Sequence, residues 1–319
     1  MKILFITSTR IGDGVLSTGL VDYLCRLHPQ ARITIAAGEH AAPLFEATPN
    51  VERVIVMVKQ RHAGHWLGLW RETAFTRWDM VVDLRRSAIS WLLLAKRRFI
   101  LKRTDEQVHR VRQLGDLFNL PEPPAPHVWT TDHHHDEARK RLPDGQQIIG
   151  IGPVTNWRAK TWRPAHFIEL TERLTASNGL FPNARIAVFG GPDERDDARP
   201  VLDAIPAGRL IDLVGAISLL TAAACLKRCD IYIGNDSAVM HLAAAAGIPT
   251  VGLFGPSNER HYAPWGFDSR VVRTKEDFDS IFPADFDHRT SDSLMDSLTV
   301  DAVETAVSDL WQNVRMRAA

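Results

Sequence analysis

The sequence predicts an α/β protein made of two doubly wound domains. In each half of the chain, short apolar strands alternate with segments of helical length, which is the pattern of βαβ units and a parallel sheet. The proline-rich run Pro121–Pro126 separates the two halves and is typical of a stiff, extended connector. A chain of 319 residues is also longer than a single hydrophobic core usually supports, which favours two domains.

The first domain is expected to cover residues 1–126. Apolar segments of strand length in it are Lys2–Thr7, Arg32–Ala37, Val51–Val58 and Met80–Leu84. The segments with helical patterning are Leu16–Leu27 and His109–Leu120. Because crossover helices fit between such strands, we expect the strands to pair in parallel.

The second domain is expected to cover residues 127–299 and repeats the pattern. Its expected strands are Gln147–Ile151, Arg185–Phe189, Leu210–Leu213, Ile231–Gly234 and Thr250–Phe254. Its expected helices are Asp132–Leu142, Pro164–Ser177, Leu219–Lys227 and Ala238–Ala246. A last helix within residues 300–319 is a candidate to pack back on the N-terminal domain. Doubly wound folds bind ligands at the carboxyl ends of their strands, so we expect the functional residues to face a central cleft between the domains.

The composition excludes several classes of protein. With 45% hydrophobic and 24% charged residues, the chain has ample apolar side chain to fold. Three cysteines are too few, and an odd number, for a disulfide framework, which favours a reducing compartment. No apolar run approaches the ~20 residues of a membrane span, and the N-terminus has no signal-peptide pattern. We therefore expect a cytoplasmic protein.

Charge is balanced overall but not along the chain. The 38 Lys and Arg residues match the 38 Asp and Glu residues, yet nine basic residues face three acidic ones between Asp83 and Arg112. This stretch is either a solvated surface or a contact for an acidic partner or anionic lipid headgroups. It has neither interleaved aromatics nor a nucleic-acid-binding motif, so we expect no nucleic-acid partner.

The turn after the first strand carries the first candidate residue. Gly12, Gly14 and Gly19 do not have the G-x-G-x-x-G spacing, so the dinucleotide-binding fingerprint is absent. The turn instead places Asp13 at the carboxyl end of the strand. Asp13 either caps the following helix or serves as a functional carboxylate, and the sequence leaves both roles open.

The loop Gly152–Arg163 is the second candidate site. Thr155 and Asn156 offer a hydroxyl and an amide, and Lys160 and Arg163 offer positive charge, which together suit a diphosphate. Two tryptophans in the same loop need a surface to pack on. The alternative is a solvated loop without a ligand.

Another strand-to-helix turn, Ile233–Leu242, suits an anion. Asp236 or Ser237 can cap the helix and leave backbone N–H groups free for the ligand. His241 lies one turn into the helix, where either a structural or a functional role is open.

A glycine turn, Val188–Glu194, brings acidic residues close behind a strand. Asp193 or Glu194 can accept hydrogen bonds from ribose or sugar hydroxyls, although a plain turn fits equally well. No metal site is expected, because His133–His135 are consecutive and the pair Cys225 and Cys229 reads as a core contact.

Taken together, these motifs resemble glycosyltransferase family 9, which contains the ADP-heptose:lipopolysaccharide heptosyltransferases. The resemblance covers nearly the whole chain, in the order and spacing of the family. The matching motifs are Ile11-Gly-Asp13, Thr155 to Lys160-x-Trp162, Phe189-Gly-Gly-Pro192, Gly234-Asn-Asp-Ser-x-x-x-His241 and Phe254-Gly-Pro-Ser257.

The resemblance implies a GT-B fold and an inverting, metal-independent transfer from a nucleotide-sugar donor, most simply ADP-heptose, with no cofactor. Asp13 would be the general base, and Lys160 would stabilise the leaving diphosphate. The implied donor-binding residues are Thr155, Asn156, Lys160, Asp193, Glu194, Asp236, Ser237, Ala238 and His241. The implied acceptor is a lipopolysaccharide core or another lipid-linked or oligosaccharide glycan, with peripheral contact at the cytoplasmic face of the inner membrane.

Three positions depart from the family pattern: Gly19 stands where proline is frequent, Gly14 where an aliphatic residue is common, and Asn156 where some members have a hydroxyl. Alternatives remain at this point: a UDP- or GDP-sugar donor, epimerisation of a nucleotide sugar, and a catalytically silent nucleotide-sugar binding module. The sequence names neither the donor base and sugar, the acceptor and linkage, nor the oligomeric state.

Overall fold

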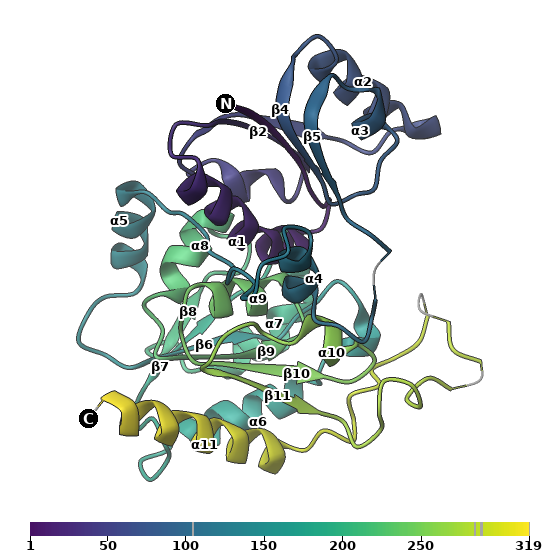
Figure 1. The fold of residues 1–319 in the computed structure, drawn as a ribbon. Coiled ribbons are helices and arrows are strands. Elements are labelled where there is room, and N and C mark those ends of the chain that lie inside the picture. Colours follow the sequence, from purple (N-terminus) through teal and green to yellow (C-terminus); the bar gives the residue numbers. More distant parts are fainter. Residues whose placement is uncertain (104, 284, 288–289, 319) are drawn as a thin grey trace. The chain divides into compact units, whose positions relative to one another are not determined.

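The computed structural model describes residues 1–103, 105–283, 285–287 and 290–318 and divides into two compact units (Figure 1). The first unit is Met1–Thr131 and the second is Asp132–Ala319. Each unit is built on its own parallel sheet with helical crossovers. The predicted pair of doubly wound α/β units is therefore confirmed.

The first unit contains a five-stranded parallel sheet in the order β3-β2-β1-β4-β5. Its strands are β1 (Lys2–Ile6), β2 (Arg32–Gly38), β3 (Val51–Met57), β4 (Trp78–Asp83) and β5 (Ala95–Ile100). Its α-helices are α1 (Ile11–Leu27), α2 (Gly64–Thr73), α3 (Ile89–Leu92) and α4 (Arg110–Asp116). The strand order reverses between β1 and β4, so the loops that follow these two strands diverge and leave room for a ligand.

The second unit contains a six-stranded parallel sheet in the order β11-β10-β9-β6-β7-β8. Its strands are β6 (Ile148–Gly152), β7 (Arg185–Val188), β8 (Leu210–Asp212), β9 (Ile231–Asn235), β10 (Thr250–Phe254) and β11 (Ser269–Arg273). Its α-helices are α5 (Asp132–Arg141), α6 (Pro164–Thr175), α7 (Arg195–Ala204), α8 (Leu219–Leu226), α9 (Ala238–Ala245), α10 (Glu259–Tyr262) and α11 (Val300–Ala318). Figure 1 shows α8 and α9 on one side of this sheet and α6 and α11 on the other. The switch point lies between β6 and β9.

The central strands are buried on both faces. Residues 3–6 of β1 and all five residues of β6 are buried. Strands covered on both sides read as continuous apolar runs, which is why the sequence predicted them well.

Two strands, β5 and β11, were not predicted, and both lie at a sheet edge. β5 contains Lys96, Arg97 and Arg98, and β11 contains Arg270 and Arg273. Charged side chains on an edge strand discourage pairing with another chain. They also break the apolar run on which the prediction of a strand depends.

The proline-rich connector packs against α1 within the first unit. The backbone N–H of His127 donates to Thr18 Oγ1 at 2.9 Å. The carbonyl oxygen of Pro124 approaches Gly19 so closely that a Cβ there would lie 2.3 Å away. Gly19, one of the departures from the family pattern, is thus required by this close approach. The first unit accordingly continues to Thr131, past residue 126.

Helix α11 packs within the second unit. Val303, Val307 and Leu310 are buried in the core of that unit, and the helix contacts α6 and β11 (Figure 1). These buried residues of the helix are part of the core of the second unit, and packing of the helix back on the N-terminal domain stays a prediction. Neither α11 nor any other helix in the described part of the chain is both long and apolar enough to cross a membrane.

Candidate active site

A cavity of about 250 Å³ opens at the β1/β4 switch point of the first unit. The β1–α1 turn, the residues after β4, and α4 form its wall. The lining residues are Thr7, Ser8, Asp13, Ser17, Leu84, Arg85, Arg86, Arg110 and Leu114. One carboxylate and three guanidinium groups therefore share the place where a doubly wound sheet binds ligands. The sequence singled out Asp13, whereas the arginines were recognised only as part of a basic stretch.

Asp13 lies in the first turn of α1 and is half-buried. The N-cap of this helix is Arg10, and no side chain caps it, so capping does not engage the Asp13 carboxylate. Ser8 Oγ donates to Asp13 Oδ2 over a long 3.4 Å. Within the described residues, no ion pair joins Asp13 to the arginines of the cavity. Its carboxylate is therefore placed to accept a proton or a hydrogen bond from a ligand.

Asp83, the last residue of β4, organises the loop that carries two of the arginines. Its carboxylate is fully buried and accepts the backbone N–H groups of Arg85 and Ser87 at 2.8 and 2.7 Å. It also accepts the hydroxyls of Ser87 and Ser90 at 2.6 and 2.5 Å. Arg86 has a φ of 55°, in the left-handed region, which this bonding holds. Asp83 was not singled out from the sequence, although an acidic residue that ends an apolar strand is a usable signal.

Arg85 has an unused hydrogen-bond donor. Its Nη1 is buried without a partner, and its guanidinium carbon lies 5.7 Å from the centre of the Trp66 ring. Leaving a buried donor unpaired costs about 1–3 kcal/mol. The site therefore favours a ligand that supplies an acceptor oxygen, and a carboxylate or phosphate supplies the strongest one.

Lys160, Asp236 and His241 form one cluster at the switch point of the second unit. Lys160 Nζ lies 3.3 Å from Asp236 Oδ2, and His241 Nε2 lies 3.9 Å from Asp236 Oδ1. The three side chains are between 4% and 15% exposed. Two loops that are far apart in the sequence thus bring three of the predicted donor-binding residues together.

The N-terminus of α9 is open to an anion. Ser237 is the N-cap residue, but its side chain makes no capping hydrogen bond, and Ala238 begins the helix. The N–H groups of a first turn and the helix dipole attract negative charge. The hydroxyl of Thr155, a buried residue of the facing loop, donates to the exposed Asn156 at 3.4 Å.

Asn235 fixes the two loops of this cluster relative to each other. It is fully buried; its side-chain oxygen accepts the backbone N–H of Trp162 at 2.9 Å, and its Nδ2 donates to the Pro153 carbonyl at 3.0 Å. The residue therefore connects the end of β9 to both ends of the loop after β6. Asn235 belongs to the family motif Gly234-Asn-Asp-Ser-x-x-x-His241, but no role for it could be predicted from the sequence.

The glycines of the two motifs make room for Tyr232. A Cβ at Gly152 or Gly234 would lie 1.9 or 2.4 Å from the Tyr232 hydroxyl oxygen. Burial raises the pKa of the Tyr232 phenol, and the neighbouring Ser237 hydroxyl opposes that shift. Tyr232 thus lies against the start of α9. Gly152 in β6 and Gly234 in β9 cannot be larger residues, because the Tyr232 hydroxyl occupies the space that a Cβ would need.

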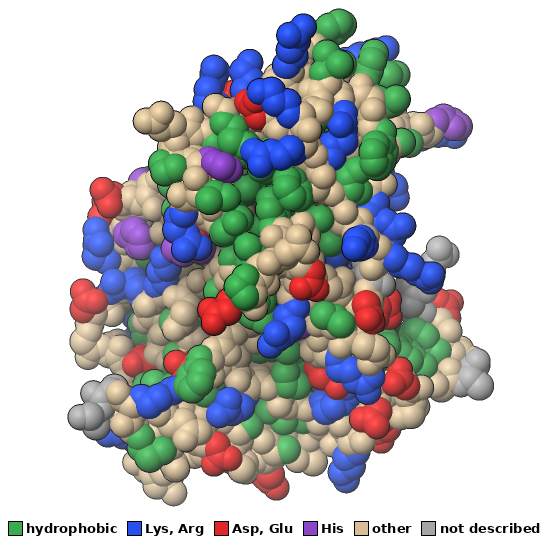
Figure 2. Space-filling view, in the orientation of Figure 1, with side chains coloured by type: hydrophobic (Ala, Val, Ile, Leu, Met, Phe, Trp, Pro, Cys, Tyr) green, Lys and Arg blue, Asp and Glu red, His purple; other side chains and the backbone are tan. Residues whose placement is uncertain are grey.

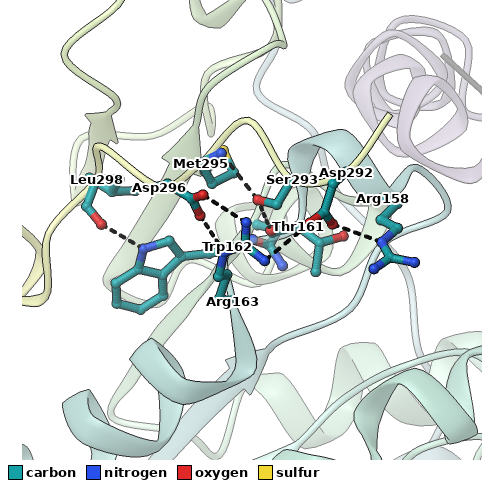
Figure 3. A network of polar contacts seen from close by, with 10 residues as sticks. Arg158, Thr161, Trp162, Arg163, Asp292, Ser293, Met295, Asp296 and Leu298 are labelled. Carbon is teal, nitrogen blue, oxygen red and sulfur yellow. Dashed lines mark hydrogen bonds and ion pairs between the residues drawn. The ribbon is translucent and has the colours of Figure 1, made fainter. Parts of the chain in front are cut away.

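A distant segment, residues 292–298, holds the loop after β6 (Figure 3). Arg163 makes a two-pronged ion pair with Asp296 and reaches Asp292 at 3.3 Å, while Arg158 donates to Asp292 at 2.9 Å. Arg163 holds the pKa of the Asp296 carboxyl below its usual 3.8. Because two carboxylates engage the Arg163 guanidinium, its predicted contribution to a diphosphate site is not supported.

Trp162, one of the two tryptophans of this loop, is a core residue. Its ring is fully buried and packs edge-on against Phe167 with 5.0 Å between ring centres. Its Nε1 donates to the Leu298 carbonyl at 2.8 Å (Figure 3). Trp157 is half-buried, with its ring centre 6.0 Å from that of Phe286. Protein rather than ligand therefore covers Trp162.

Asp193 and Glu194, which follow the Gly190–Gly191 turn, lie in different environments. Glu194 is half-buried and accepts the backbone N–H of Gly191 at 2.7 Å, which stabilises the turn. Asp193 is exposed.

Cys225 and Cys229 are buried, as predicted, and Cys25 is buried as well. All three are free and buried, and burial raises the pKa of Cys25 and of Cys225 to about 11. In the described ranges, no three His, Cys, Asp or Glu side chains are grouped so that they could hold a metal ion.

Comparison with known proteins settles the family. Residues 77–280, more than half of the chain, match the family model described as glycosyltransferase family 9 (heptosyltransferase). The chain belongs to glycosyltransferase family 9. It is thus an enzyme that transfers a glycosyl group, as the resemblance of its motifs implied.

Relatives cover almost the whole chain. Lipopolysaccharide heptosyltransferase 2 of Escherichia coli (strain K12) is 24% identical over 343 aligned positions, covering 93% of this chain and 94% of the relative. The glycosyltransferase family 9 structure from Veillonella parvula DSM 2008 has a TM-score of 0.79 at 21% identity and covers 98% of this chain and 97% of that one. E. coli heptosyltransferase WaaC with ADP has a TM-score of 0.71 at 17% identity, with 97% and 100% covered. These structures confirm the GT-B fold.

Proposed function

We propose that this family 9 enzyme transfers a heptose from ADP-heptose to a hydroxyl of a lipopolysaccharide-core acceptor, with inversion at the anomeric carbon and without a metal ion. The name of the E. coli relative supports the sugar and the acceptor class, and the WaaC structure with ADP supports the nucleotide. No non-protein cofactor enters the reaction.

The observation that carries the proposal is Asp13 in the arginine-lined cavity. A half-buried carboxylate that no cation neutralises can act as a general base. Arg85, Arg86 and Arg110 beside it suit an acceptor that carries carboxylate or phosphate groups, because guanidinium binds both in a bidentate manner. An acidic core glycan fits this chemistry.

The second unit supplies the donor side. Lys160, 15% exposed, offers a positive charge beside the open N-terminus of α9. Both suit a diphosphate, with Thr155, Asn156, Ser237 and Ala238 near it. In this proposal Asp236 and His241 contact the phosphate or the sugar, and Asp193 or Glu194 the nucleoside side. The central cleft that the sequence predicts between the two domains stays a prediction.

In the proposed step, the acceptor oxygen attacks the anomeric carbon from the face opposite the diphosphate. The bond between that carbon and the diphosphate oxygen breaks, and ADP leaves with the bonding electrons. Asp13 takes the proton of the acceptor hydroxyl, and Lys160 with the α9 N-terminus stabilises the charge on the leaving phosphate. Inversion follows from a single displacement. Protein cations take the role that a metal ion would otherwise have.

We place this reaction at the cytoplasmic face of the inner membrane, because a lipid-linked acceptor and a nucleotide-sugar donor meet there. The basic stretch between Asp83 and Arg112 supports peripheral contact with that membrane, since anionic lipids attract such segments.

The test is Asp13→Asn, which keeps the shape of the side chain and removes its basicity. We expect the transfer rate to fall by about 10²–10⁴-fold, the usual contribution of a general base. Binding of ADP should stay within about twofold, since Asp13 belongs to the first unit. The rate is measured with ADP-heptose and a purified core acceptor, and ADP binding by calorimetry.

Three results would count against the proposal. A transfer rate that is unchanged in Asp13→Asn would show that Asp13 is not the general base. Wild-type enzyme that binds ADP but transfers nothing would favour a catalytically silent module, and preference for UDP or GDP would move the donor to another sugar class.

A further inference from the structure

One edge of the first unit exposes more apolar side chain than a solvated surface requires. Phe75, Trp91, Leu92 and Leu94 are 92%, 70%, 65% and 60% exposed. Phe75 lies in the turn between α2 and β4, Trp91 and Leu92 are on α3, and Leu94 precedes β5. Scattered exposed residues need no explanation, but a group of large ones marks an interaction surface.

These residues come from adjoining segments. The backbone N–H of Trp78 donates to the Leu94 carbonyl at 2.8 Å, so the turn that carries Phe75 lies beside the turn that carries Leu94. Helices α2 and α3 are also in contact. Figure 2 shows green side chains over the part of the molecule where Figure 1 labels α2, α3 and β5, with blue Lys and Arg next to them. We call Phe75, Trp91, Leu92 and Leu94 the α3 patch.

The core of the unit does not use these side chains. Leu69, Ile89 and Leu93 fill the inner side of the same elements and are buried. Because those residues already pack α3 and its neighbours onto the core, the exposed apolar side chains of the patch are not needed to hold these elements in place.

The turn that presents the patch is firmly held. The Arg98 guanidinium donates to the carbonyls of Ser90 at 2.8 Å, Leu93 at 2.6 Å and Ala95 at 3.1 Å. Ser90 in turn donates its hydroxyl to the buried Asp83. A rigid turn keeps Trp91, Leu92 and Leu94 outside, where a flexible one could fold them inward.

Positive charge surrounds the α3 patch. Between residues 64 and 98 there are seven Lys and Arg against three Asp and Glu. Of the three acidic residues, Asp83 is buried, Asp79 pairs with Lys96, and Glu72 pairs with Arg53. The exposed Arg71, Arg77 and Arg97 therefore dominate the local field. Exposed aromatic and aliphatic side chains with basic neighbours are the composition of surfaces that bind anionic bilayers.

We propose that the α3 patch and its basic neighbours dock the enzyme on a bilayer that contains anionic lipid. Trp91, Leu92, Leu94 and Phe75 enter the boundary between headgroups and acyl chains, and Arg77 and Arg97 contact lipid phosphates. The inference deepens the proposed function, on which it rests in one respect: a lipid-linked acceptor brings the enzyme to a membrane.

The test is co-sedimentation of the full-length protein with vesicles of phosphatidylcholine containing 30% phosphatidylglycerol, or of phosphatidylcholine alone. We expect the wild type to bind the anionic vesicles and to lose binding as salt increases. The triple change Trp91→Ala, Leu92→Ser and Leu94→Ser should weaken binding by on the order of tenfold or more. Arg97→Gln should weaken it about fivefold, since each basic residue near the surface contributes ~1 kcal/mol.

The matched control changes exposed apolar residues of the second unit. Phe267→Ser with Met316→Ser removes side chains that are 83% and 69% exposed, and binding should stay unchanged. A fluorophore attached at Leu92→Cys reports insertion directly by a blue shift on anionic vesicles. The three native cysteines are buried, and the pKa of Cys25 and of Cys225 is about 11, so they should not take the label at neutral pH.

Each outcome decides the proposal. Equal binding by wild type and triple variant, or no wild-type binding to anionic vesicles, overturns it. A dimer seen by light scattering that the triple change dissociates would assign the patch to a second copy of the chain instead. Transfer to a deacylated, water-soluble acceptor should be unaffected by the triple change. Vesicle binding needs no turnover, so failure of transfer and failure of docking are separately visible.

Discussion

The loops after β4 and after β9 occupy the same topological position in the two units, and they differ in whether the charged side chains near them are paired. Each strand ends on a buried polar residue, Asp83 or Asn235, that binds backbone groups of the adjoining loops. In the second unit the neighbouring charges are paired, with Lys160 on Asp236. In the first unit, Arg85 keeps an unpaired buried donor.

This difference indicates that the two loops suit different kinds of ligand. A paired and buried cluster is preorganised for one ligand, as a nucleotide diphosphate site has to be. An electropositive cavity whose arginines form no ion pair within the described residues suits an anionic ligand, which would supply the acceptor oxygens. Substitutions in the two units should therefore affect binding of the donor and of the acceptor differently.

The largest effect is expected at Lys160. Lys160→Met removes the positive charge from the donor side and should lower the transfer rate by about 10²–10³-fold. The matched control is Arg158→Met on the same loop, whose exposed side chain pairs with Asp292, and it should change the rate less than about twofold. Steady-state kinetics on both variants, with thermal unfolding as a check of folding, decides the point. Equal losses in the two variants would contradict it.

Asn235→Ala should destabilise the second unit. It leaves the Trp162 N–H and the Pro153 carbonyl buried without their partner, which we expect to cost about 2–3 kcal/mol of unfolding free energy. Urea unfolding measures the loss. The control Asn156→Ala, at an exposed position, should stay within about 0.5 kcal/mol. A loss at Asn235 no larger than at Asn156 would show that the loop does not depend on Asn235.

Arg85→Met should weaken binding of the acceptor and leave binding of the donor unchanged. Losing one charge-assisted contact should raise KM for an anionic acceptor about tenfold, with ADP affinity unchanged. Arg26→Met, which removes an exposed arginine paired with Asp22, is the control and should change neither quantity. A fall in ADP affinity at Arg85→Met would erase the contrast between the two units.

The smallest effect is expected from the segment that holds the donor loop. Arg163→Met should cost about 0.5–1 kcal/mol at pH 7, because the ion pairs with Asp292 and Asp296 are partly exposed. Folding lowers the pKa of both carboxyls from 3.8, so their contribution is present above pH 4 and is lost as pH falls through the folded values. Wild type and variant should therefore converge in stability as the pH falls below the folded pKa values of the two carboxyls, which lie under 3.8. A difference that persists there would assign the effect to packing.

Much of the fold could be read from the sequence because the central strands are apolar throughout. The edge strands β5 and β11 could not, since charge on an edge removes the pattern that identifies a strand. The candidate residues Asp13, Lys160 and Asp236 could be singled out from their position after strands, and their roles stay predictions. The partners that decide other roles were not visible: Arg163 meets Asp296 across 133 residues of chain. Asn235 was missed because a buried polar residue is recognised by its contacts, whereas Asp83 could have been noticed as the acidic end of an apolar strand.

The most direct test of the two-part site is a calorimetric titration of ADP into wild type, Asp13→Asn and Lys160→Met, with and without Mg²⁺. The account predicts that ADP binds the wild type more tightly than UDP, GDP or CMP, independently of Mg²⁺. It further predicts that Asp13→Asn binds ADP within about twofold of the wild type, while Lys160→Met loses about tenfold or more. Equal ADP affinity in all three proteins, or a loss at Asp13→Asn as large as at Lys160→Met, would contradict it.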